Sequence, residues 1–249
     1  MLRLFHAYFG RLFKWPVFLA LMGLMLIGGV GAAFALKDEP TIHMVPYVIA
    51  ILIFPHYVGI IIGLFNYPLF TNGTIRNQLS VGHSRSNIFI MQWAASCTLS
   101  VVLYLIVSLS VIGVTALTDA SGDMSAKAVV QGVAFAALLV VQFTTISQLF
   151  CVVFKGVKSF LAIYLGNQVI ACAGIMLMSF SELPEAVCYL LPTTLCMQIN
   201  SLGVDTAGNF FGEGSSVSFS FPIAFAVLIA ENAALFTAGL VYFRKTDLN

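Results

Sequence analysis

Six long apolar runs dominate the pattern of hydrophobic and polar positions along the chain. Each run is long enough to cross a bilayer as a helix, which takes about 20 residues. None shows the alternation of polar and apolar residues that is typical of strands in a membrane β-barrel. The pattern therefore predicts six transmembrane helices, over residues 15–36, 46–70, 88–117, 128–154, 160–180 and 218–243.

The composition indicates that lipid surrounds these helices. Hydrophobic residues make up 60% of the 249 positions, charged residues make up only 8%, and the mean hydropathy is +1.00. A soluble domain carries about 25% charged residues to cover its surface. We therefore expect an all-α integral membrane protein with a single transmembrane domain over residues 1–249. The net charge of +1 gives no indication of a nucleic-acid partner.

The distribution of basic residues predicts how the helices are oriented. Lys and Arg near the ends of membrane helices are enriched on the cytoplasmic side. Only Lys37 and Lys127 lie in the odd-numbered connections, which carry most of the acidic residues. The other basic residues flank the first helix, fill the even-numbered connections or follow the last helix: Arg3, Arg11, Lys14, Arg76, Arg85, Lys155, Lys158, Arg244 and Lys245. Both termini are therefore expected in the cytoplasm.

Residues 1–14 form an amphipathic pattern ahead of the first transmembrane helix. At 100° per residue, one face holds Leu2, Phe5, Phe9, Leu12 and Phe13, and the opposite face holds Arg3, His6, Gly10 and Lys14. This pattern is typical of a helix that lies in the membrane interface. Such a helix either simply flanks the first span or acts as an elbow that also cradles a partner subunit.

A long polar run, residues 72–87, lies on the expected cytoplasmic side between the second and third helices. Residues 74–81 can form two helical turns, Gly82 can supply a left-handed C-terminal cap, and Ser84 can cap the helix that follows. A short helix joined so closely to a membrane helix can transmit a push from a cytosolic protein. The simpler interpretation is a basic loop that fixes the topology through Arg76 and Arg85.

The same run carries a resemblance to a known family. GTIRNQLSVGHSR, at residues 73–85, resembles the cytoplasmic loop of ABC type-2 permeases, and the ending FRKTDL at residues 243–248 is similar to their F-x-K-x-D-L ending. The resemblance implies that residues 74–81 are a coupling helix which docks on an ATPase subunit. The residues implied in coupling are Thr74, Ile75, Arg76, Asn77, Gln78, Leu79, Gly82 and Arg85.

The resemblance also implies the partners and the location. The chain contains no G-x-x-x-x-G-K-[ST] motif, so ATP and Mg²⁺ would be bound by a separate cytosolic ATPase, and this chain would need no metal or cofactor. Two ATPase copies and two permease chains, as a homodimer or a heterodimer, would form an exporter in a bacterial cytoplasmic membrane. Small relatives resemble exporters of toxins and antimicrobial peptides, including phenol-soluble modulins and bacteriocins. The expected cargo is an amphipathic peptide, with drugs or lipids as the alternative.

Two features lie outside the loop. Residues 182–218 form a long outer segment whose apolar runs are too short to span, so we expect re-entrant helices followed by a solvated loop.

Glu231 is the only acid well inside a predicted span, and Asn232 follows it. Such a pair can mark an intramembrane polar site, as in a secondary transporter or channel, but those usually show several intramembrane charges. The alternative is a carboxyl that ties two helices together through Gln142, Asn167 or Gln168.

Overall fold

The computed structural model describes residues 2–14, 16–35, 54–117, 126–154, 158–159, 161–167, 169 and 221–245. Every element in the described part of the chain is helical. The predicted outer segment, residues 182–218, lies outside the described residues. The elements are α1 (Leu2–Lys14), α2 (Pro16–Ala35), α4 (Phe54–Thr71), α5 (Thr74–Ser80), α6 (Arg85–Leu117), α7 (Ala126–Phe154) and α11 (Phe221–Lys245).

Four of these helices contain stretches long and apolar enough to cross a membrane: Pro16–Ala35, Arg85–Leu117, Val129–Phe154 and Pro222–Lys245. The chain is therefore a multi-pass membrane protein with an all-α fold. Helices α4 and α5 meet at a bend of 52° and could together form a fifth, broken span. Residues 161–167 of the predicted fifth helix are helical, and most of its remainder lies outside the described residues. The total of six spans stays a prediction.

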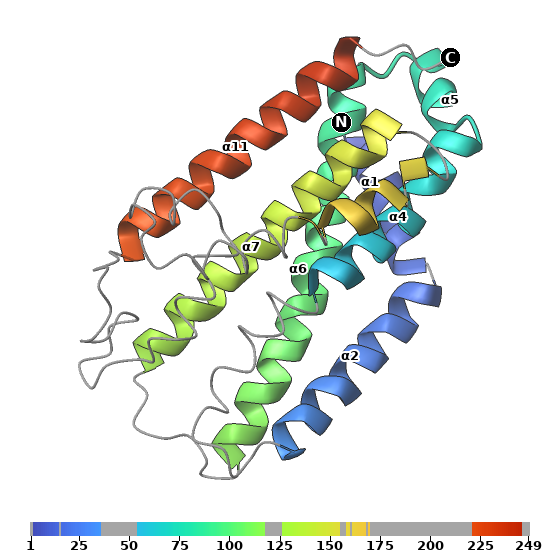
Figure 1. The fold of residues 1–249 in the computed structure, drawn as a ribbon. Coiled ribbons are helices and arrows are strands. Elements are labelled where there is room, and N and C mark those ends of the chain that lie inside the picture. Colours follow the sequence, from blue (N-terminus) through green and yellow to red (C-terminus); the bar gives the residue numbers. More distant parts are fainter. Residues whose placement is uncertain are drawn as a thin grey trace.

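Helices α6 and α7 form the centre of the bundle (Figure 1). Helix α2 packs on α6, whereas α4 and α11 pack on α7. The outer helices leave large aliphatic side chains exposed; Ile27 of α2 has 72% and Ile223 of α11 has 54% of its surface accessible. Apolar faces of this extent are unfavourable in water but match hydrocarbon. The exposed faces of α2 and α11 are thus the surfaces expected to meet lipid.

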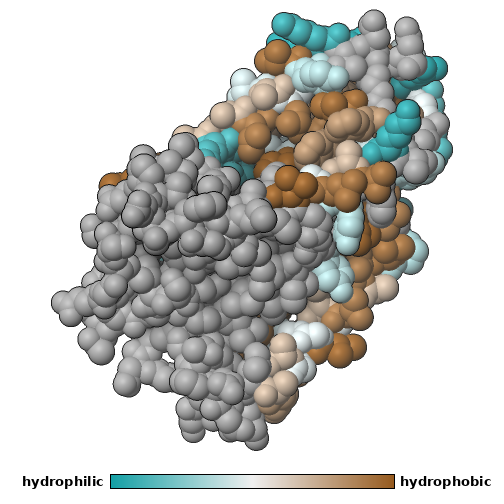
Figure 2. Space-filling view, viewed as in Figure 1, coloured by the Kyte–Doolittle hydropathy of each residue, from teal (hydrophilic) through white to brown (hydrophobic). Residues whose placement is uncertain are grey.

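One end of the bundle is polar. Helix α5, the first turn of α6 and the last turn of α11 meet there, since Arg85 Nη1 donates a hydrogen bond to the backbone oxygen of Arg244 over 3.2 Å. Figure 2 shows hydrophilic side chains gathered at this end and apolar side chains along much of the remaining coloured face. The structure therefore brings basic residues from the loop and from the end of the chain to one place.

Helix α1 is helical as expected, and one flank of it packs on the rest of the protein. Leu4 and Tyr8 are each only 2% exposed and belong to the main core, whereas Phe13, predicted on the apolar face, is exposed. Leu4, Tyr8 and Arg11 follow one another at helical spacing, on the flank between the two predicted faces. A helix in the membrane interface turns its apolar face to lipid, so an exposed Phe13 agrees with the predicted pattern, while the flank with Leu4 and Tyr8 packs on the protein.

Candidate functional site

Helix α5 is short and sharply delimited. Gly73 precedes it with a φ of 65°, and Gly82 follows it with a φ of 92°. Residues other than glycine rarely adopt these backbone φ angles. The Gly82 amide donates to the oxygen of Leu79, and the His83 amide donates to the oxygen of Gln78, which is the pattern of a Schellman cap. The predicted cap at Gly82 is confirmed, and the helix ends at Ser80 rather than at position 81.

The next helix begins almost at once. The Ser84 hydroxyl accepts a hydrogen bond from the Asn87 amide over 3.3 Å, which confirms the predicted N-terminal cap of α6. Only residues 81–84 separate the two helices. This short connection can absorb little of a displacement of α5, so most of the displacement would reach the 33-residue helix α6.

The inner face of α5 is held by the rest of the protein. Ile75 is only 3% exposed, and Leu79 packs against the main core. The Gln78 side-chain oxygen accepts a hydrogen bond from the Tyr8 hydroxyl of α1 over 3.1 Å. Of the residues implied in coupling, Ile75 is thus buried, Gln78 and Leu79 are half-buried, and all three hold α5 in position. Thr74 and Arg85 are also partly buried.

The outer face of α5 is open. Arg76, Asn77 and Ser80 are exposed, and they follow one another on one side of the helix. Val81, just beyond the last turn, has 76% of its surface accessible. We call these four residues the docking face. A cation, an amide, a hydroxyl and an exposed aliphatic group lie together on it, and Gly82 is exposed at its edge.

Helix α1 holds α4 and α5 in their relative positions. Besides the bond from Tyr8 to Gln78, Arg11 Nη2 donates to the backbone oxygen of Phe65 over 3.4 Å, and its guanidinium carbon lies 5.5 Å from the centre of the Phe65 ring. Burial lowers the pKa of the Arg11 side chain. The sequence analysis missed the role of Tyr8, and the spacing of Leu4, Tyr8 and Arg11 at i, i+4 and i+7 was the available signal.

The Tyr8 hydroxyl should titrate well above an ordinary tyrosine. Burial raises its pKa from 10 to about 12. Because the pKa of Tyr8 is higher in the folded than in the unfolded protein, the free energy of unfolding keeps its full value below pH 10. It decreases as the pH rises from 10 towards 12. The measurement is the tyrosinate absorbance of wild type minus that of Tyr8→Phe. A difference curve centred near pH 10 would show that Tyr8 is not buried against α5.

A cluster of buried amide side chains lies where α4, α6 and α7 meet. Asn66 Nδ2 donates to Gln148 Oε1 over 2.7 Å and to Ser96 Oγ over 3.4 Å, and Asn66 Oδ1 accepts from Gln92 Nε2 over 3.0 Å. The side chains of all four residues, Asn66, Gln92, Ser96 and Gln148, are fully buried. Gln92 Oε1 and Gln148 Nε2 have no hydrogen-bond partner among the described residues. The sequence analysis did not identify this cluster.

The cluster lies towards the polar end of the bundle. Asn66 is five residues from the end of α4, and Gln148 is six residues from the end of α7. Gln92 is in the third turn of α6. These side chains therefore join α4, which leads into α5, to the central helices α6 and α7. They do so near the end of the bundle at which α5 lies.

The predicted intramembrane pair, Glu231 and Asn232, occupies a different place. Gln142 Nε2 of α7 donates to Glu231 Oε2 over 2.9 Å, which confirms Gln142 as a partner. Asn232 Nδ2 bonds to the backbone oxygen of Leu228 in its own helix. Asn167 instead donates to Ser147 Oγ, and the Gln168 side chain lies outside the described residues. The carboxyl thus ties α7 to α11, and it is not brought together with α5.

The described residues contain no group of three or more His, Cys, Asp and Glu side chains that could hold a metal ion. No protein-family model matches the chain, and no curated protein matches it. The chemistry of the site therefore rests on α5, on the side chains that hold it and on the face that it leaves open.

Proposed function

We propose that the chain is the membrane permease subunit of an ATP-driven exporter. In this proposal it has six spans, it lies in a bacterial cytoplasmic membrane, and its polar end, with both termini, faces the cytoplasm. The observation that carries the proposal is helix α5, which is fixed on one side by Ile75 and Gln78 and exposed on the other at Arg76 and Asn77. A loop that only fixes the orientation of the membrane helices needs basic residues, but it does not need a helix whose inner side is held by the rest of the protein.

The contacts around α5 support force transmission. Its inner face is held by α1, α4 leads into it through residues 72–73, and α6 follows it after residues 81–84. Protein interiors are close-packed, so a shift of α5 must be passed on to the helices that it touches. The amide cluster at Asn66 lies on that path. A push on the docking face would therefore change how α4 packs against α6 and α7.

The chemistry of the docking face favours a protein partner over a lipid surface. Its four side chains include one cation, two neutral polar groups and one exposed valine, which is the mixture found in protein interfaces. In the proposed complex, a cytosolic ATPase binds this face and ATP and Mg²⁺ are bound by that subunit. Two ATPases act with two permease chains, which are either identical or different.

The proposed cargo is an amphipathic peptide such as a toxin or an antimicrobial peptide. The exposed apolar faces of α2 and α11 support a membrane path for a partly apolar molecule, although drugs and lipids share this property. A secondary transporter that uses Glu231 is less favoured, because Gln142 holds that carboxyl at a helix contact. Peptides, drugs and lipids are separated by asking which of them stimulates ATP hydrolysis by the reconstituted complex.

The double substitution Arg76→Ala with Asn77→Ala should weaken the ATPase complex about thirtyfold or more, because truncating two central interface residues at roughly 1–2 kcal/mol each costs about 2–4 kcal/mol. The chain is co-expressed with the ABC ATPases of its source, and retained ATPase and cargo-stimulated hydrolysis are measured. Lys14→Ala removes an equally exposed cation from α1 and should leave both unchanged. An intact complex in the double variant would rule out coupling through α5.

A further inference from the structure

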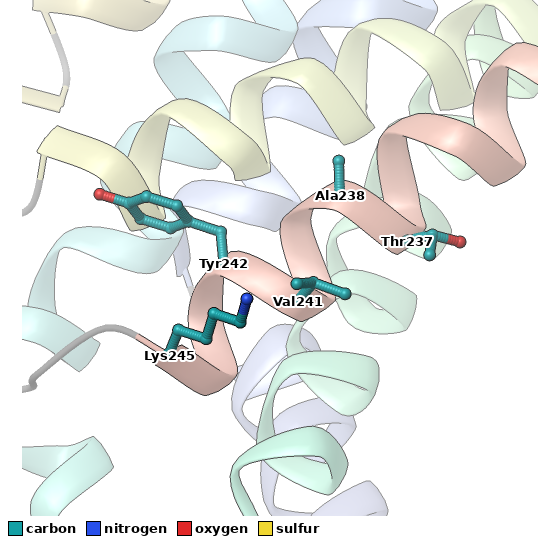
Figure 3. Close-up of a pocket in the computed structure, with 5 residues that line it drawn as sticks. All are labelled: Thr237, Ala238, Val241, Tyr242 and Lys245. Carbon is teal, nitrogen blue, oxygen red and sulfur yellow. The ribbon is translucent and has the colours of Figure 1, made fainter.

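A groove of about 610 Å³ lies on the outer side of α11, near its polar end. Its lining comes from the last three turns of that helix (Figure 3). The residues of this lining are Thr237, Ala238, Val241, Tyr242 and Lys245. The opposite side of the same turns is buried, since Gly239 and Phe243 pack inward. The groove is therefore a feature of the face that meets lipid and not of the bundle interior.

A cation, the Lys245 ammonium, lies at one end of this groove. In Figure 3 the Lys245 ammonium is turned back along α11 towards Tyr242 and Val241, rather than away from the helix end. Among the described residues, no hydrogen bond or ion pair of Lys245 is found. A lysine near the end of a membrane helix lays its aliphatic stem along apolar surface and places its ammonium at the interface, where lipid phosphates lie. A ligand that combines a negative charge with an apolar chain satisfies both parts of the groove.

We propose that this groove binds one anionic phospholipid. The Lys245 ammonium pairs with the headgroup phosphate, and Tyr242 lies at the depth of the ester groups, where tyrosine is enriched in membrane proteins. One acyl chain follows Val241, Ala238 and Thr237 towards the middle of the bilayer. Because α11 ends at the polar end of the bundle, the lipid belongs to the leaflet on that side.

The surrounding charges favour an anionic over a zwitterionic lipid. Arg85 and Arg244 lie at the same end and are joined through the Arg244 backbone. Glu231 is the only acidic residue among the described positions, and it lies 14 residues earlier in α11, about 21 Å along the axis. A basic residue near the membrane surface contributes about 1 kcal/mol to attraction of anionic lipid. Three basic residues of the described part of the chain, Arg85, Arg244 and Lys245, thus lie at this end, and the inference does not depend on the exporter assignment.

Native mass spectrometry of the purified full-length chain tests the proposal. The protein in detergent is offered equal amounts of phosphatidylglycerol and phosphatidylcholine. We expect the wild type to retain one phosphatidylglycerol in preference to phosphatidylcholine, and Lys245→Gln to bind it about fivefold more weakly, which corresponds to the loss of one basic contact. Lys14→Gln, which removes an exposed cation from α1, should retain it like the wild type.

A second variant separates the groove from the charge. Ala238→Trp fills the groove and keeps Lys245, so it should also lose the bound phosphatidylglycerol. Circular dichroism and thermal unfolding establish that each variant is folded. The proposal is overturned if Lys245→Gln retains the lipid, if Lys14→Gln loses it equally, if both lipids bind alike, or if Ala238→Trp binds like the wild type.

Discussion

Asn66→Ala should lower the free energy of unfolding by about 2–4 kcal/mol. The substitution removes the partner of both Gln92 Nε2 and Gln148 Oε1 while these groups stay buried. A buried polar group left without a partner costs about 1–3 kcal/mol, although single side-chain bonds in membrane proteins average nearer 0.6. Reversible unfolding in mixed detergent micelles, followed by circular dichroism, measures the change.

Asn77→Ala is the matched control for this experiment. It removes the same amide from an exposed position of α5, and it should change the stability of the isolated chain by less than about 0.5 kcal/mol. Equal stability of the two variants would show that the cluster of Asn66, Gln92, Ser96 and Gln148 does not hold α4 in place.

Gly29→Leu should destabilise the packing of α2 on α6 by about 1–3 kcal/mol, which is the usual cost of overpacking. A Cβ atom at position 29 would collide with Ser110 Oγ and would lie 3.2 Å from the backbone oxygen of Val107. Backbone atoms cannot move aside as a flexible side chain can, so the two helices must separate. Close approach through small residues is a common means of helix association in membranes.

The neighbouring glycine provides the control. A Cβ atom at position 28 would meet nothing within 4 Å, and this residue faces outward. Gly28→Leu should therefore unfold like the wild type in the same detergent assay. If both leucine variants lose stability to the same extent, the cause is a general property of glycine in α2 and not its contact with α6.

Much of the fold was predictable because the bilayer constrains it strongly. Apolar runs of spanning length identified α2, α6, α7 and α11, since backbone groups in lipid must be bonded within helices. The caps at Gly82 and Ser84 were also predictable, because local backbone geometry decides them. These features depend on residues that are close together in the sequence.

The contacts that hold the candidate site were not predictable in this way. Tyr8 and Gln78 are 70 positions apart, and Asn66 and Gln148 are 82 positions apart. Nothing in the local pattern distinguishes these side chains from other polar residues in apolar helices. The sequence offered Gln142, Asn167 and Gln168 as partners of Glu231, and only the packing of α7 on α11 selects Gln142.

The separation of α5 into two faces changes the expected coupling residues. The resemblance implied that Ile75, Gln78 and Leu79 take part in coupling. The structure buries Ile75, leaves Gln78 and Leu79 half-buried, and exposes Arg76, Asn77, Ser80 and Val81. A seven-residue helix has only about two turns, so burying one side leaves a narrow strip for a partner.

Site-specific photo-crosslinking in cells tests the central proposal most directly. A benzophenone amino acid is placed at position 77, on the docking face, and in parallel at position 6, an exposed position of α1. The account predicts an adduct at position 77 whose peptides include a G-x-x-x-x-G-K-[ST] motif, and no such adduct at position 6. Absence of an ATPase adduct at position 77, or an equal yield at both positions, would contradict the account.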